Sequence, residues 1–76
     1  MIKKYERYCA SELYYTKIGV DNETDLEYRR DIIEAGIQRC LGAGQFAELC
    51  GVDRDKIALI YTEMKEKMEA LYDEVN

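Results

Sequence analysis

The sequence predicts an all-α fold of four helices in a single domain, residues 1–76. Its apolar residues recur at steps of three and four, which is the spacing of one face of a helix. The chain contains no proline and only five glycines, so few positions interrupt a helix. At 76 residues it buries only about 60% of the surface of its unfolded form, so we expect a small core or one shared with a partner.

The first helix is predicted over about residues 2–18, because Tyr5, Cys9 and Leu13 follow this spacing. Gly19 is expected to end it in the left-handed conformation that glycine adopts readily at helix ends. The polar segment that follows is predicted to be a loop.

The second helix is predicted over about residues 25–41. Thr24 and Glu27 have the spacing of a capping box, in which each side chain accepts a hydrogen bond from a main-chain N–H in the first turn. Gly42 and Gly44 are expected to end this helix, because glycine is unfavourable inside one.

Two more helices are predicted toward the C-terminus. A short one covers about residues 45–50 and is closed by Gly51, and a long one over about 53–75 begins at the N-cap Asp53. The long helix spans about 33 Å, so its apolar stripe is longer than one small domain is expected to cover. We therefore predict a homo-oligomer. The predicted interface consists of Met64, Met68, Leu71, Tyr72 and Val75.

Residues 43–61 carry the spacing of a helix-turn-helix. Ala47 is small where the two helices cross, Gly51 permits the tight turn between them, and Val52 follows the turn. The apolar residues expected to face the core are Phe46, Cys50, Ile57 and Ile60. This segment, a quarter of the chain, resembles the helix-turn-helix of lambda-repressor and Cro-like regulators.

The resemblance implies that the helix from Asp53 onward lies in the major groove of DNA, with Arg54 and Lys56 reading bases. The carboxylates of Asp53 and Asp55 would then face the phosphates, and the chain carries a net charge of −5, whereas DNA-binding domains are commonly basic. We therefore favour a structural role for the motif. The complete prediction is an all-α fold of four helices with a helix-turn-helix-like corner and a long C-terminal helix.

A basic, tyrosine-rich surface is predicted on the first helix and the start of the second. Residues 1–20 contain four basic and two acidic residues, a net +2 within an acidic chain. Tyrosine rings beside Lys and Arg hold nucleotides and single-stranded nucleic acid. The candidate ligand-binding residues are Lys4, Arg7, Tyr8, Tyr15, Arg29 and Arg30. The alternative is that the rings cover the core and the basic residues pair with acidic neighbours.

Catalytic and metal sites are not predicted. The chain has no histidine, which excludes Ser–His and Cys–His nucleophiles. The three cysteines, Cys9, Cys40 and Cys50, form no CxxC pair and are expected to be reduced and buried. We predict no enzyme activity and no cofactor. Without a signal peptide or an apolar run long enough for a membrane span, a cytoplasmic location is expected.

These features together predict a small, acidic, non-enzymatic binding protein. Its size and acidity are similar to those of the small accessory proteins of phages and mobile elements. We expect it to inhibit a host defence factor by occlusion or by imitating nucleic-acid phosphates, or to sequester a nucleotide. The partner is therefore a protein or a nucleotide. The alternatives are a dimeric helix-turn-helix regulator that binds DNA and a purely structural subunit of an assembly.

Overall fold

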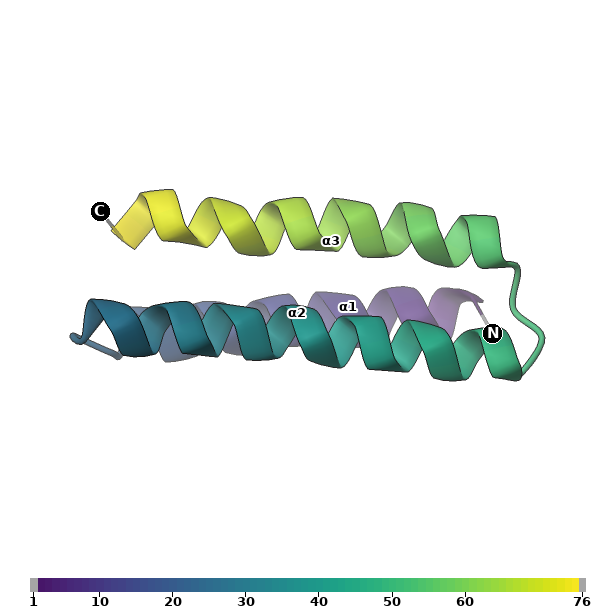
Figure 1. Ribbon diagram of the computed structural model, residues 1–76, viewed down its shortest axis with the longest axis horizontal. Coiled ribbons are helices and arrows are strands. Elements are labelled where there is room, and N and C mark those ends of the chain that lie inside the picture. Colours follow the sequence, from purple (N-terminus) through teal and green to yellow (C-terminus); the bar gives the residue numbers. More distant parts are fainter. Residues whose placement is uncertain (1, 76) are drawn as a thin grey trace.

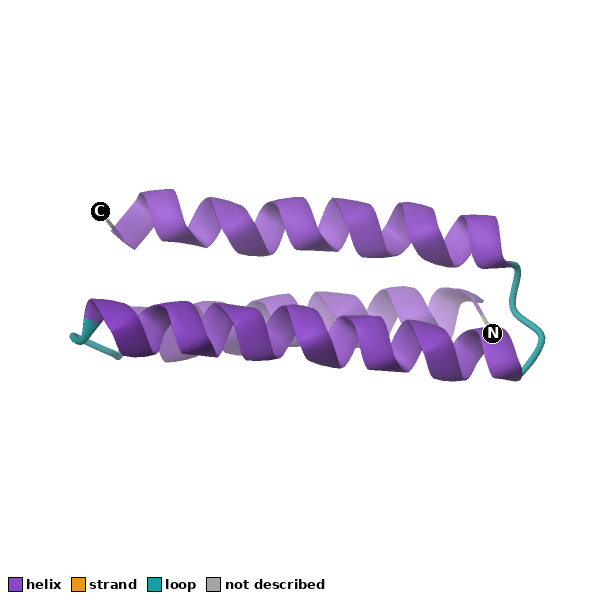
Figure 2. Ribbon diagram, in the orientation of Figure 1, coloured by secondary structure: helices purple, strands orange, loops and turns teal. Residues whose placement is uncertain are grey.

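The computed structural model describes the main chain of residues 2–75 and the side chains of residues 2–72. It contains three helices: α1 (Ile2–Asp21), α2 (Leu26–Leu49) and α3 (Arg54–Val75). Figure 2 shows that helices make up nearly all of this part of the chain and that it contains no strand. The all-α prediction is therefore confirmed, and the prediction of four helices is wrong.

The helices form an up-down-up bundle. In Figure 1, α2 runs antiparallel to both α1 and α3, and short loops join consecutive helices at opposite ends. Each helix packs against the other two, and the Cα atoms extend over 40 × 16 × 15 Å. Because three helices of similar length lie side by side, each one covers the apolar stripes of the others along the bundle.

Helix α2 continues through the glycines that were expected to end it. The predicted third helix is the C-terminal part of α2. A Cβ atom on Gly44 would lie 2.9 Å from the Tyr5 hydroxyl and 3.0 Å from Ile57 Cγ2, so this glycine allows close helix packing. A Cβ atom on Gly42 would meet nothing within 4 Å. The packing of α2 on its neighbours outweighs the cost of about 1 kcal/mol that each internal glycine imposes.

The first loop also differs from its prediction. Helix α1 extends to Asp21, so Gly19 lies inside it. The N-cap of α2 is Asp25 rather than Thr24, because one carboxylate oxygen of Asp25 accepts hydrogen bonds from two main-chain N–H groups of the first turn, at 2.9 and 3.2 Å. Aspartate and threonine both cap helices well, and the sequence places them side by side.

The second loop ends α2 in a Schellman motif. Gly51 has φ 95° and donates to the Glu48 carbonyl at 3.0 Å, and Val52 donates to the Ala47 carbonyl at 3.0 Å. The Asp53 side chain then caps α3. Gly51 as the turn residue and Asp53 as the N-cap are thus confirmed. The predicted helix-turn-helix-like corner is a hairpin, because the two long helices that it joins lie antiparallel (Figure 1).

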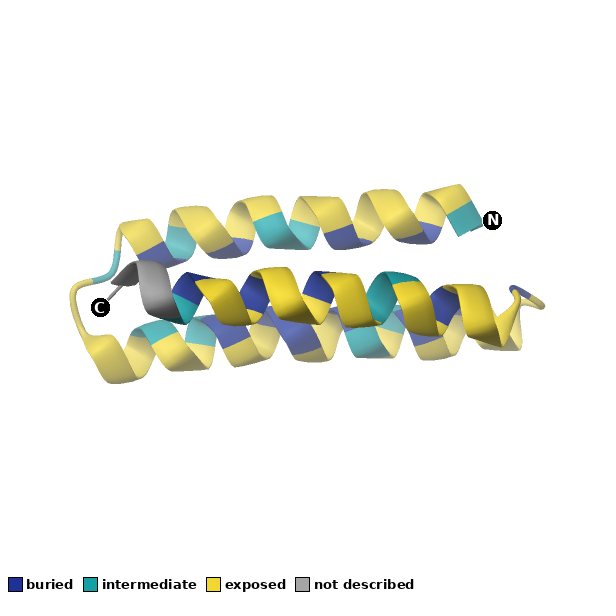
Figure 3. Ribbon diagram, turned by 90° about the horizontal axis from the view of Figure 1, so that it is seen from above, coloured by how far each residue is buried: buried dark blue, intermediate teal, exposed yellow. Residues whose placement is uncertain are grey.

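The core runs along the axis of the bundle, and the buried residues of each helix face the other helices (Figure 3). It comprises Tyr5, Cys9, Val20, Ile33, Ile37, Cys40, Ala47, Val52, Ile57, Met64, Met68 and Leu71. Thr16 is the buried polar side chain among them, at 2% exposure.

This core contains most of the stripe that was predicted to form an oligomer interface. Met64, Met68 and Leu71 are 7%, 0% and 5% exposed, and Tyr72 packs half-buried against them. The Val75 side chain lies outside the described ones. Because α1 and α2, with 20 and 24 residues, are similar in length to α3 with 22, they cover its stripe within one chain, and the length of the stripe does not require a second copy.

Candidate functional site

An apolar groove lies between the first half of α1 and the second half of α2, with a volume of about 240 Å³. Its lining comes from Lys4, Tyr5 and Tyr8 on α1 and from Ala43, Phe46, Ala47 and Cys50 at the end of α2. Among these side chains, only Lys4 carries a formal charge.

The depth of the groove follows from side-chain size. Tyr5 and Ala47 form the floor and are buried in the core, and the small Ala43 side chain leaves space above them. Tyr8 and Phe46 form opposite walls and are 39% and 68% exposed. Phenylalanine is usually buried, so its exposure on the wall of an apolar groove is the unusual feature of this surface.

The groove is one end of a longer surface, which we call the α1–α2 face. On α2, residues at steps of three and four share the side that faces α1: Tyr28, Ile32, Ala35, Arg39, Ala43, Phe46 and Cys50. On α1 the matching residues are Lys4, Tyr8, Ser11, Glu12 and Tyr15. Three contacts show the pairing of these stripes: the groove itself, an ion pair between Glu12 and Arg39, and the approach of Ile32 to Gly19.

Carboxylates are scarce on this face. Glu12 is the one in these two stripes, and it accepts a hydrogen bond from Arg39 Nε at 2.6 Å. Among the described residues of the two stripes, Lys4 at the edge of the groove therefore has no unpaired carboxylate beside it. Burial raises the pKa of the Tyr8 hydroxyl above its ordinary value, and the negative charge of Glu12 adds to this rise.

The structure brings together two of the six predicted ligand-binding residues. Lys4 and Tyr8 both line the groove. Tyr15 lies two turns further along the same side of α1, where its exposed ring packs edge-to-face on Tyr14 with a centroid distance of 5.4 Å. Arg7 is exposed on the outer surface of α1.

Arg29 and Arg30 lie elsewhere. They belong to the first turns of α2, at the end of the bundle opposite the groove (Figure 1). The Arg29 guanidinium donates a hydrogen bond to the Glu23 main-chain carbonyl, which ties it to the first loop. The six predicted residues thus do not form a single site.

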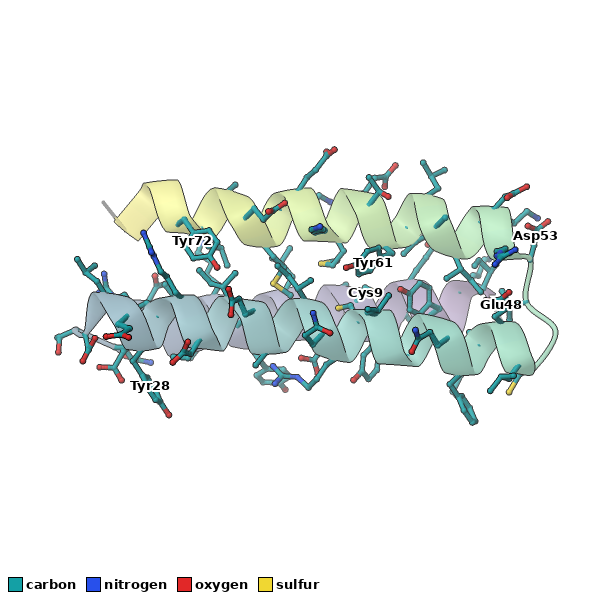
Figure 4. All side chains as sticks on the ribbon, viewed as in Figure 1. Cys9, Tyr28, Glu48, Asp53, Tyr61 and Tyr72 are labelled. Atoms are coloured by element: carbon teal, nitrogen blue, oxygen red, sulfur yellow. The ribbon has the colours of Figure 1, made fainter. Side chains whose placement is uncertain are left out.

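The predicted DNA-reading residues lie at the start of α3. Arg54 is 3.5 Å from a carboxylate oxygen of Glu48, and both side chains are exposed. Figure 4 shows Glu48 and Asp53 near each other at this end of the bundle. Lys56 is exposed, and its main-chain N–H donates to Asp53. The two cations therefore lie among carboxylates.

The cysteines divide into two kinds. Cys9 and Cys40 are fully buried on facing sides of α1 and α2, and a side-chain hydrogen bond between them, together with burial, raises the pKa of Cys40. Cys50 is exposed and lines the groove. The expectation of buried thiols holds for the first two and is wrong for Cys50.

Sequence reasoning assigned Phe46 and Cys50 to the core because it ended α2 at the glycines. If the helix continues, the core stripe passes through Cys40, Gly44 and Ala47. Phe46 and Cys50 then fall beside that stripe, on the edge toward α1. The helical spacing of this stripe, which continues without interruption past the glycines, was the sequence signal from which the groove could have been predicted.

A second hollow, between α2 and α3, differs in chemistry. It has a volume of about 390 Å³, and charged side chains line it, among them Glu34, Lys65 and Glu69. Tyr61 and Tyr72 project from α3 toward α2 in Figure 4 and fill its apolar side. Because charged side chains make up much of its lining, this hollow lacks the apolar character of the groove.

Comparison with protein-family models, with curated proteins and with solved structures gives no match for this chain. None of the described helices has the length and apolar character that crossing a membrane requires. The groove is therefore the feature of the protein from which a function can be inferred.

Proposed function

We propose that the protein is a non-enzymatic binding module that holds the apolar side chains of a helix from a partner protein in the α1–α2 groove. The observation that carries the proposal is the exposure of Phe46 on the wall of this groove, next to Leu49, which is 86% exposed. Burying one such side chain contributes roughly 1.5–3 kcal/mol, so two of them supply a large part of a moderate binding energy.

The shape of the site suits a helix. A shallow groove between two antiparallel helices accepts the ridge of a third, which is the way helices pack in bundles. The stretch of α2 from Ala43 to Cys50 spans about 10 Å, or two helical turns. A partner helix with apolar residues at i, i+3, i+4 and i+7 presents a stripe of that length.

A protein ligand fits this lining better than a nucleotide. The lining offers one cation, Lys4, and its main chain is helical, so few main-chain donors are free for phosphate oxygens. Inhibition of a host defence factor by occlusion is a narrower form of this proposal and stays a prediction.

A display selection tests the proposal. Helical peptides are selected from a random library on the native chain, and each is then measured on two variants, Phe46→Ser and Leu59→Ser. Leu59 is 61% exposed on α3 and lines no part of the groove, so it is a matched control.

We expect the selected peptides to lose most of their affinity for Phe46→Ser and to keep it for Leu59→Ser. Circular dichroism checks that both variants remain helical. Peptides that bind wild type and Phe46→Ser equally would show that the groove is not the binding site.

A further inference from the structure

We propose that the partner helix is acidic, with carboxylates flanking its apolar anchors and facing the start of α1. This inference rests on the proposed function and names the chemistry of the partner. It comes from the charges around the groove, which differ in sign from the net charge of −5 of the whole chain.

The cations at this end of α1 are free for a partner. Lys3, Lys4 and Arg7 are all exposed, and none of them makes an ion pair within the part of the chain that the structure describes. Lys4 lies at the edge of the groove itself. An acidic segment docking there gains charge pairs at the rim of an apolar contact, the usual arrangement in protein interfaces.

The nearby carboxylates point elsewhere. Glu6 lines a hollow between α1 and α3, on the other side of α1. Glu12 is paired with Arg39. Glu48 faces α3, where it lies beside Arg54. From all three helices, therefore, no described carboxylate is available to neutralise Lys4 at the groove.

The position of these lysines is also unfavourable for the free chain. The first turn of α1 contains no acidic residue, and Lys3 and Lys4 lie at the positive end of the helix dipole. Acidic residues are preferred at such positions because they stabilise the helix. The carboxylates of a partner at this place offset the repulsion between the two lysines and the positive end of the helix dipole. Binding of such a partner therefore explains why an acidic chain has lysines there.

The test uses one selected peptide made in two forms. Both keep the same apolar anchors, and the flanking positions carry Glu in one form and Lys in the other. We expect the Glu form to bind more tightly at low salt and the difference to shrink as salt is added. Binding is measured by fluorescence anisotropy, and slower reaction of the Cys50 thiol with a thiol reagent places the peptide in the groove.

The protein variants are Lys4→Glu and, as a control, Lys65→Glu on the α2–α3 side of the bundle. Lys4→Glu is expected to lower the affinity for the Glu peptide by roughly three- to tenfold and to raise the affinity for the Lys peptide. The same change should raise the melting temperature, because it places a carboxylate in the first turn of α1. Opposite effects on binding and stability separate a binding role from a structural one.

The outcomes distinguish the two proposals. Equal binding of both peptide forms, still lost in Phe46→Ser, would overturn the acidic partner and leave the proposed function standing. Phe46-dependent dimers in sedimentation would assign the groove to a second copy, and competition by single-stranded DNA would assign it to nucleic acid. Either result overturns the inference. Peptide binding that does not depend on Phe46 removes both proposals.

Discussion

The Tyr5 hydroxyl donates a buried 2.9 Å hydrogen bond to the Cys40 main-chain carbonyl, in the space that Gly44 leaves open. This bond ties α1 to α2 directly beneath the groove, because the Tyr5 ring also forms the groove floor. The position of α1 against α2, and so the width of the groove, depends on this contact.

Replacing Gly44 with alanine is expected to destabilise the protein. Alanine gains about 1 kcal/mol in helix propensity, but its Cβ atom would meet the Tyr5 hydroxyl at 2.9 Å and Ile57 Cγ2 at 3.0 Å. Overpacking of this kind costs about 1–3 kcal/mol, and Tyr5 is too buried to move away. Gly42→Ala is the matched control, two residues away with nothing near its Cβ atom, and should stabilise by up to about 1 kcal/mol.

Urea denaturation followed by circular dichroism measures both glycine variants. Equal stabilisation by the two substitutions would show that α1 does not approach α2 closely at Gly44.

The free energy of unfolding is expected to fall as the pH rises above about 10. Burial raises the pKa of the Tyr5 hydroxyl above its ordinary value, and a side-chain hydrogen bond with Cys9 adds to this effect. A raised pKa in the folded state means that the unfolded state loses its proton first, so the stabilisation is complete below about pH 10 and is lost at higher pH.

Tyr5→Phe tests this dependence on pH. It should lower the stability at neutral pH by about 1 kcal/mol through loss of the hydrogen bond to Cys40. It should also make the fall from about pH 9 to about pH 11 less steep, because one titrating group is gone. Denaturation at a series of pH values measures both effects, and an unchanged slope would contradict the assignment to Tyr5.

Thr16→Val is expected to stabilise the protein. Thr16 is only 2% exposed, and its hydroxyl oxygen has no hydrogen-bond partner among the described residues. An unsatisfied buried hydroxyl costs about 1–3 kcal/mol, and valine has nearly the same shape. We expect an increase of about 1 kcal/mol. Thr16→Ser keeps the hydroxyl and removes a buried methyl group, so it should destabilise; stabilisation by serine would refute the argument.

The sequence was sufficient for the helical class, for the turn after α2 and for the start of α3, because the signals there are local. Asp53 caps a helix by bonding to N–H groups two and three residues away, and Gly51 adopts its positive φ within a single turn. Neither feature depends on a distant part of the chain.

The length of α2 and the groove were missed for the opposite reason. Gly44 lies where Tyr5, 39 positions earlier, packs closely on α2, and no local pattern shows this contact. Because the predicted helix ended too early, the prediction placed Phe46 in the core and required a partner to cover the stripe around Met68. The packing of α1 and α3 on α2, which outweighs the cost of both internal glycines, thus accounts for the wrong helix count and for the overlooked site.

Cys50 is expected to be the one cysteine of the three that reacts rapidly with a thiol reagent in the native protein. Its thiol is exposed on the groove wall, whereas Cys9 and Cys40 are 0% exposed. Reaction at the buried thiols requires the bundle to open, which in a domain of this size slows it by a factor on the order of 100 or more. Absorbance with an aromatic disulfide reagent should therefore show one fast thiol in buffer and three in denaturant.

Cys50→Ser supplies the control, since this variant should show no fast thiol while it remains folded. Two or three fast thiols in native wild type would mean that α1 and α2 separate readily at Cys9 and Cys40. The groove would then be a transient feature of the bundle, because Tyr5 on its floor lies one helical turn from Cys9 and moves with it.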